Sequence, residues 1–101
     1  MILVDKIIDN NKITKVTFGS GIESINGGAF AGNVISEVDF SRSTKLTTIS
    51  ENAFINQKIV SLSLPSSVTT IGKSAFYGNL IEELELKGYL LKDEKTNKGS
   101  F

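Results

Sequence analysis

Residues 59–76 decide the fold, and they read Ile59-Val-Ser-Leu-Ser-Leu-Pro-Ser-Ser-Val-Thr-Thr-Ile-Gly-Lys-Ser-Ala-Phe76. Apolar and polar residues alternate in the first half, which is the two-residue period of a strand with one buried face. The proline ends the strand because its nitrogen carries no hydrogen to donate. In the second half, Val68 and Ile71 precede the pair Ala75-Phe76. The stretch therefore predicts a strand, a turn and a return segment that ends at a buried phenylalanine.

The same pattern recurs along the chain. The pair Ala-Phe occurs at residues 29–30, 53–54 and 75–76, so the copies are 24 and 22 residues apart. Each alanine follows an isoleucine by four residues, and each phenylalanine precedes an amide residue by three, at Ile25, Ile49 and Ile71 and at Asn33, Gln57 and Asn79. The longer copy has a two-residue insertion in a polar turn, where insertions cost little. Because a unit of about 22 residues cannot bury its own apolar face, stacked coils are expected.

Each repeat is expected to contribute one short parallel strand, and the alternating segments are residues 16–18, 38–40, 62–64 and 84–86. The residues before each Ala-Phe pair are typical of a helix cap, which predicts one short helical turn at that point. Phe30, Phe54 and Phe76 occupy one position of the repeat, together with Ile8. We expect these four side chains to stack as a column inside the coils.

The chain has 101 residues, which suits one domain. The predicted repeat domain covers residues 1–91, and it divides into a half repeat 1–11, repeats 12–33, 34–57 and 58–79, and a partial repeat 80–91. Residues 92–101 are predicted to be a polar tail or linker. Terminal coils show apolar residues to water unless something covers them. We therefore expect an excerpt of a longer array, which either folds its tail back or associates end to end with another copy.

Composition excludes several classes of function. The chain has no cysteine and no histidine, so it offers no disulfide, thiolate nucleophile, triad base or imidazole ligand. Eleven basic and eleven acidic residues give a net charge of zero, which favours neither nucleic acid nor an anionic membrane. No apolar run reaches the length of about 18 residues that membrane insertion needs, and no signal peptide is recognisable. The prediction is a protein that is not an enzyme and needs no cofactor.

Residues 59–76 resemble the BspA-type leucine-rich repeats, also described as the Treponema pallidum type. That family's pattern is an apolar-x-x-apolar-x-apolar strand, a proline or small residue, V-x-x-I-G-x-x-A-F, and an Asn or Cys. Earlier repeats depart from it, with Gly19 and Ser41 in place of the proline and Asn26 and Ser50 in place of the glycine. The resemblance implies a right-handed leucine-rich-repeat solenoid, mainly β, with a parallel sheet on its concave side. It also implies a cell-surface or secreted protein that adheres to host or matrix proteins.

Outward-facing strand residues are the candidate binding site. Two columns are expected on the concave sheet, made of Lys15, Glu37, Ser61 and Glu83 and of Thr17, Asp39, Ser63 and Glu85. Neighbouring strands lie about 4.8 Å apart, so each column forms a continuous surface. The columns are either a solvated face without a role or a recognition surface for a protein or glycan. The predicted function is a non-catalytic binding module, and the alternative is a structural spacer that presents another domain.

The acidic residues of these columns also admit two chemical interpretations. Glu37 with Asp39, and Glu83 with Glu85, have the i and i+2 spacing of a carboxylate pair. Glycosidases use pairs roughly 5 to 9.5 Å apart, but an open sheet does not supply the burial that raises a general acid's pKa. Calcium at Asp39, or among Glu82, Glu83 and Glu85, would lack the spacing of a calcium loop. Neither a catalytic nor a metal site is predicted.

The amides at Asn33, Gln57 and Asn79 admit two interpretations as well. They could form a ladder that binds a ligand, or they could satisfy backbone groups where each coil turns. Asn and Gln side chains commonly do the second in buried turns. The second interpretation is favoured.

Overall fold

The computed structural model describes residues 13–30, 32–88 and 99–101. The half repeat 1–11, the place of Ile8 in the phenylalanine column and residues 89–98 therefore lie outside the described residues. Seven strands occur in the described part, namely β1 (Lys15–Thr17), β2 (Ser24–Ile25), β3 (Glu37–Asp39), β4 (Thr48–Ile49), β5 (Ser61–Leu64), β6 (Thr70–Ile71) and β7 (Glu83–Leu86).

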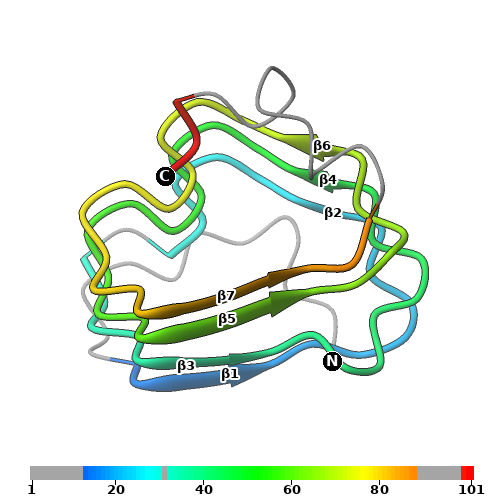
Figure 1. Cartoon of the computed structure of the whole chain (residues 1–101), viewed down its shortest axis with the longest axis horizontal. Coiled ribbons are helices and arrows are strands. Elements are labelled where there is room, and N and C mark those ends of the chain that lie inside the picture. The colour runs from blue at the N-terminus through cyan, green and yellow to red at the C-terminus, as the bar shows by residue number, and fades with distance from the viewer. Residues whose placement is uncertain (1–12, 31, 89–98) are drawn as a thin grey trace.

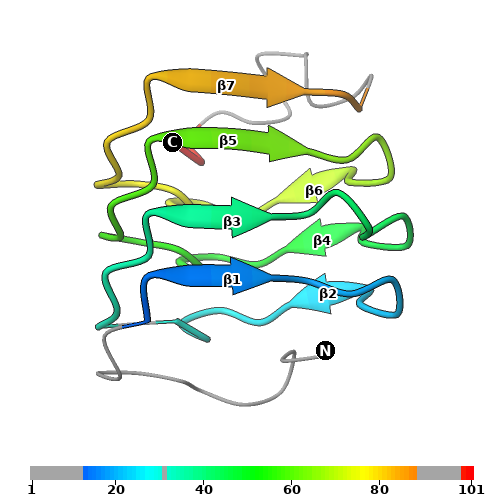
Figure 2. The ribbon, with the colours of Figure 1, turned by 90° about the horizontal axis from the view of Figure 1, so that it is seen from below.

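The strands form two layers, and the chain passes from one to the other in every coil (Figures 1 and 2). β1, β3, β5 and β7 lie side by side in the front layer, in the order of the sequence (Figure 2). β2, β4 and β6 form the back layer as one three-stranded sheet. All strand pairs are parallel. The predicted strand of each repeat is thus confirmed to within a residue, and the return segments add the short strands of the back layer.

The helical turns expected before the Ala-Phe pairs are not found, since the described residues contain no helix. Each Ala-Phe pair instead follows a tight turn, in which the Ala53 N–H donates to Ser50 O at 3.1 Å and the Ala75 N–H to Gly72 O at 3.2 Å. The residue before each alanine has a left-handed backbone, with φ of 72° at Gly28, 62° at Asn52 and 59° at Ser74. A right-handed helix cannot continue through such a residue, so each turn ends there.

A second left-handed residue lies four positions further along each repeat, at Gly32, Asn56 and Gly78. Each segment from the first of these left-handed residues to the amide residue that follows the second is called a corner turn. The corner turns are residues 28–33, 52–57 and 74–79. Glycine and asparagine adopt this conformation at the lowest cost. Ser74 is the one residue of another type with positive φ among the described residues.

The phenylalanines of the corner turns stack as a buried column. The ring centroids of Phe30 and Phe54 are 5.2 Å apart, those of Phe54 and Phe76 are 5.4 Å apart, and both pairs are nearly parallel. All three side chains are buried. This confirms the predicted column for the described residues. Phe18 and Phe40 flank the column from the strand side, where each meets Phe54 edge-on.

Residues 99–101 form part of the folded core although they belong to the predicted tail. Phe101 stacks on Phe76 with ring centroids 5.3 Å apart and continues the column. Gly99 has a φ of 79°, like the residue before each alanine. Ser100 takes the place of the alanine, and its buried hydroxyl donates to Ile71 O at 3.1 Å. The sequence Gly-Ser-Phe thus repeats the start of a corner turn.

Amide side chains join neighbouring coils beside the column. The backbone N–H groups of Ile13, Ile35 and Ile59 donate to the side-chain oxygens of Asn33, Gln57 and Asn79 at 2.9, 3.1 and 3.0 Å. The amide nitrogens donate to phenylalanine carbonyls, as from Gln57 Nε2 to Phe30 O at 2.9 Å. The amides therefore satisfy backbone groups at the coil junctions, as the favoured interpretation predicts.

Candidate functional site

The candidate site is the outward side of the front layer. We call it the strand face and define it by Lys15, Thr17, Glu37, Asp39, Ser61, Ser63, Glu83 and Glu85. All eight residues are exposed, as predicted. The parallel register sets Lys15 beside Glu37 and Thr17 beside Asp39, and it sets Ser61 beside Glu83 and Ser63 beside Glu85. The structure thus brings the residues of each column together within each strand pair.

Two ion pairs and one hydrogen bond link charged residues on this side. Lys15 Nζ lies 3.8 Å from Glu37 Oε2, and Lys87 Nζ lies 3.8 Å from Glu85 Oε1. The Ser63 hydroxyl donates to Glu85 Oε1 at 2.8 Å. Exposed ion pairs of this kind contribute little to stability because water screens them. Their side chains are free to exchange these contacts for contacts with a partner.

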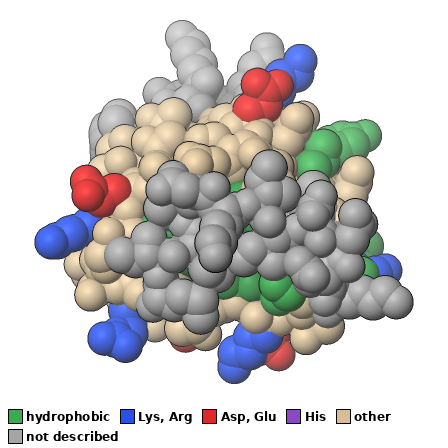
Figure 3. Space-filling model, turned by 180° about the vertical axis from the view of Figure 1, so that it is seen from behind, with side chains coloured by type: hydrophobic (Ala, Val, Ile, Leu, Met, Phe, Trp, Pro, Cys, Tyr) green, Lys and Arg blue, Asp and Glu red, His purple; other side chains and the backbone are tan. Residues whose placement is uncertain are grey.

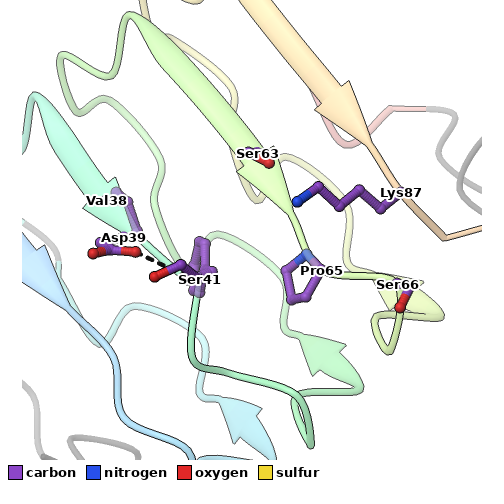
Figure 4. A pocket seen from close by; sticks show the side chains of 8 residues that line it. Val38, Asp39, Ser41, Ser63, Pro65, Ser66 and Lys87 are labelled. Atoms are coloured by element: carbon purple, nitrogen blue, oxygen red, sulfur yellow. Dashed lines mark hydrogen bonds between the residues drawn. The ribbon is translucent and has the colours of Figure 1, made fainter.

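Asp39 is held in its ionised form by the turn that follows β3. The Ser41 hydroxyl and the Ser41 backbone N–H both hydrogen-bond its carboxylate and lower the pKa of Asp39 below its ordinary value. The backbone N–H donates to Asp39 Oδ1 at 2.8 Å, a bond drawn in Figure 4. A carboxylate that accepts such bonds prefers to stay charged. The strand face therefore keeps this negative charge at every physiological pH.

A seam divides the front layer between β3 and β5. Ladders join β1 to β3 and β5 to β7, but none joins β3 to β5 within the described residues. At the other junctions the Ser36 N–H donates to Thr14 O at 2.9 Å and the Glu82 N–H to Val60 O at 2.7 Å. The equivalent N–H of Val60 has no such partner among the described residues. The seam coincides with the longer repeat, whose extra residues follow β3.

The seam opens into a hollow of about 260 Å³ at the carboxyl ends of β3 and β5 (Figure 4). Val38 lies at its base and is only half-buried, whereas the equivalent Leu62 is buried. The rest of the lining is mostly polar and includes Asp39, Ser41, Ser63, Pro65 and Lys87. Sequence reasoning did not identify this hollow or Lys87 as part of the site. The two-residue insertion was the only signal that pointed to it.

Comparison with known families assigns the chain to one of them. The family described as "BspA type Leucine rich repeat region" matches residues 3–96 in six copies. The chain belongs to the BspA-type leucine-rich repeat family. No curated protein and no solved structure matches the chain. The family match agrees with the parallel coils, the phenylalanine column and the amide junctions described above.

The carboxylate pairs of this BspA-type repeat lie on the open strand face. Glu37, Asp39, Glu83 and Glu85 are all exposed, whereas a general acid is usually held in a pocket that shields it from water. No group of three or more acidic side chains is placed to hold a metal ion in the part of the chain that the structure describes. Every buried side-chain nitrogen and oxygen there has a hydrogen-bond partner.

Charged side chains lie around the outline of the molecule in Figure 3, where acidic and basic groups lie beside each other at several places. Among the described residues no helix is long and apolar enough to cross a membrane. On the strand face the acidic residues of β3 and β7 lie in register with lysine, threonine and serine residues of the paired strands. The strand face is therefore the surface on which a functional proposal rests.

Proposed function

We propose that this BspA-type repeat is a non-catalytic recognition module that binds a protein partner through its strand face. The observation that carries the proposal is the set of eight exposed side chains on β1, β3, β5 and β7, which stand in register within each of the two strand pairs. Solenoids commonly use such extended faces for binding. Each coil adds one row, so the face can follow an elongated surface of a partner.

The charge and the side-chain types of the strand face restrict the class of partner that would bind it. The strand face has four carboxylates and one lysine, and Lys87 lies at its border. A positively charged region of a host or matrix protein would complement it, since opposite potentials raise association rates and exclude wrong partners. None of the eight side chains is aromatic, so the face lacks the flat apolar rings on which sugars stack. This favours a protein over a glycan.

Membership of the BspA-type family also supports a cellular location for this binding activity. We propose that the protein acts at a cell surface or after secretion, as an adhesion module. The alternative role is a spacer that holds another domain away from the surface. The uniform coil junctions favour that role, since the stacked rings and amide bonds repeat at each junction and give a stiff unit.

A charge-reversal experiment separates these roles. The parent chain is tested for binding to an array of matrix proteins and glycans, beside a variant that carries lysine at Glu37, Asp39, Glu83 and Glu85. A matched control carries lysine at Glu23 and Glu51, which are exposed outside the strand face. Exposed changes alter stability by less than about 0.5 kcal/mol each, so all variants should fold.

Recognition by the strand face predicts that a partner of the parent is lost from the first variant and retained by the control. A partner that binds both variants as tightly as the parent would place the site elsewhere. A parent chain that binds nothing in the array would favour the spacer.

A further inference from the structure

The outer edge of β7 pairs with no other strand of the described residues, and the opposite edge of β7 pairs with β5. The Glu83 and Lys87 N–H groups donate to Val60 O and Leu64 O on the β5 side, at 3.2 and 3.3 Å. Successive N–H groups of a strand point to opposite sides, so those of Leu84 and Leu86 point away from β5. The outer edge of β7 therefore presents backbone groups at the spacing of a strand.

Apolar side chains are uncovered at the same edge. Leu84 is 45% exposed, although Leu62 in the same position of the preceding repeat is 2% exposed. Tyr77 is 58% exposed and Phe101 is 38% exposed. A hollow of about 560 Å³ lies beside them, lined by Phe76, Tyr77, Ile81, Leu84 and Phe101 among others. One repeat earlier, β7 lies beside β5 and covers the equivalent residue, Leu62.

The charge of this edge indicates what would complement it. Glu82, Glu83 and Glu85 are all exposed, and Lys87 is the one basic residue beside them within the described segment. The molecule contains an example of a matching strand, because Lys15-Val16-Thr17 pairs in register with Glu37-Val38-Asp39. There, Lys15 lies opposite Glu37 with 3.8 Å between the charged atoms. A strand with a basic residue followed by an apolar one thus fits beside an acidic strand of this fold.

We propose that the outer edge of β7 accepts a parallel strand from a partner protein, in which lysine or arginine alternates with apolar residues. The basic side chains of the added strand lie opposite Glu83 and Glu85. Its apolar side chains cover Leu84 and enter the neighbouring hollow, and its backbone continues the hydrogen-bond ladder of the front layer. This is recognition by strand addition, in which the main chain supplies affinity and alternate side chains supply specificity.

This edge site goes beyond the strand face, since its main determinants are backbone groups and the apolar side chain of Leu84. The two sites share Glu83 and Glu85, so charge reversal at these residues does not tell them apart. Leu84 belongs to the edge alone. Glu37 and Asp39 belong to the strand face alone, because β5 lies between β3 and β7 (Figure 2).

The existing junctions also predict which backbone groups of the added strand are used. The Glu37 and Glu83 N–H groups, which belong to outward-facing residues, donate to Thr14 O and Val60 O on the preceding strand. In an added strand, the N–H groups of the outward basic residues would likewise donate to β7. The N–H groups of its apolar residues would point to solvent.

The test uses the full chain and a capped heptapeptide in which lysine and valine alternate, with binding followed by fluorescence anisotropy. Two further peptides are N-methylated, one at its lysines and one at its valines. We expect lysine methylation to weaken binding by about tenfold or more, which is about 1.4 kcal/mol, and valine methylation to leave it unchanged. Absence of binding, or an equal loss for both peptides, would overturn the proposal.

Protein variants provide the second arm. Leu84→Gln should weaken peptide binding by about tenfold, which is about 1.4 kcal/mol, and Glu37→Lys with Asp39→Lys should not. Loss in the strand-face variant but not in Leu84→Gln would overturn the edge site and leave the strand face as the binding surface. The methylated peptides need no change in the protein, so this comparison stands even if a variant folds poorly.

Discussion

The corner turns and the front layer are built from the same repeats, yet the ring stacking and the amide bonds of the corner turns recur more regularly than the ladder of the front layer. At each described junction of the corner turns, a phenylalanine stacks on the next at 5.2 to 5.4 Å and an amide oxygen accepts a hydrogen bond from an isoleucine N–H. The front layer is less regular. Its ladder is interrupted between β3 and β5, and its outward residues change from repeat to repeat.

The difference indicates that one region of this protein determines its folding and another is available for recognition. Close packing and satisfied buried polar groups leave little freedom at the corner turns. The outward side chains of the front layer meet water, so they can vary without affecting the core. We infer that the corner turns specify the stack and that the front layer carries the binding surfaces.

The largest effect is expected in the middle of the phenylalanine column. Phe54 is fully buried and lies between Phe30 and Phe76, so Phe54→Ala should destabilise the fold by about 3 to 5 kcal/mol. Phe101→Ala is the matched control, because its ring is 38% exposed and stacks on Phe76 alone among the rings of the described residues. Chemical denaturation measures both. If the two variants lose the same stability, the column does not act as one stack.

The amide junctions give the next effect. In Gln57→Leu the Ile35 N–H loses its side-chain partner inside the core, whereas the Phe30 carbonyl keeps its hydrogen bonds from Asn33. An unsatisfied buried group costs about 1 to 3 kcal/mol, so a loss in that range is expected. Lys58→Leu changes the exposed neighbouring residue and should cost less than about 0.5 kcal/mol. Equal melting temperatures for the two variants would contradict the role of the amide.

A smaller effect, of opposite sign, is expected at Ser74. Its φ of 59° is strained for a serine, and no side-chain hydrogen bond of Ser74 occurs among the described residues. Ser74→Gly should stabilise the fold by about 0.5 kcal/mol, since the relief of strain exceeds the entropy that glycine adds to the unfolded chain. Ser74→Val should destabilise it by about 1 kcal/mol or more, because β-branched residues avoid this conformation. Thermal unfolding of both variants checks the signs.

Much of the corner turns could be predicted from the sequence. Three copies of Ala-Phe at fixed spacing predicted the column, and the following amides predicted the backbone bonds, because both are properties of a repeated position. The left-handed backbone at Asn52 and Ser74 was missed. Their side chains do not show it as glycine does, and a helical turn was expected in its place.

The front layer was predicted less completely. The eight strand-face residues are exposed as alternation requires, because a strand sends successive side chains to opposite sides. The seam depends on how a two-residue insertion after β3 moves one strand relative to the next, which no local pattern encodes. Phe101 on Phe76 agrees with the expectation that the tail folds back. The corner-turn form of Gly-Ser-Phe was not predicted, because it differs from Ser-Ala-Phe at two of three positions and the surrounding residues are polar.

The smallest expected effect is on the pH dependence of stability at Asp39. The pKa of Asp39 is lowered by the Ser41 hydroxyl and then by the Ser41 backbone N–H. A carboxylate with a lowered folded-state pKa adds stability above its unfolded pKa and loses it as the pH falls through the folded pKa. Ser41→Ala should raise the pKa of Asp39, measured by carbon NMR titration, and Ser63→Ala should not. An unchanged Asp39 titration in Ser41→Ala would show that the hydroxyl has no part in it.

Native-state hydrogen exchange tests the contrast between the two regions most directly. The Ile35 and Ile59 N–H groups bond to amide side chains at the corner turns, at 3.1 and 3.0 Å. The Val60 N–H at the seam has no partner among the described residues. We predict that Ile35 and Ile59 exchange only through global unfolding and that Val60 exchanges much faster through local opening. Equal protection at all three positions would mean that the front layer is as continuous as the corner turns, and would contradict the division proposed here.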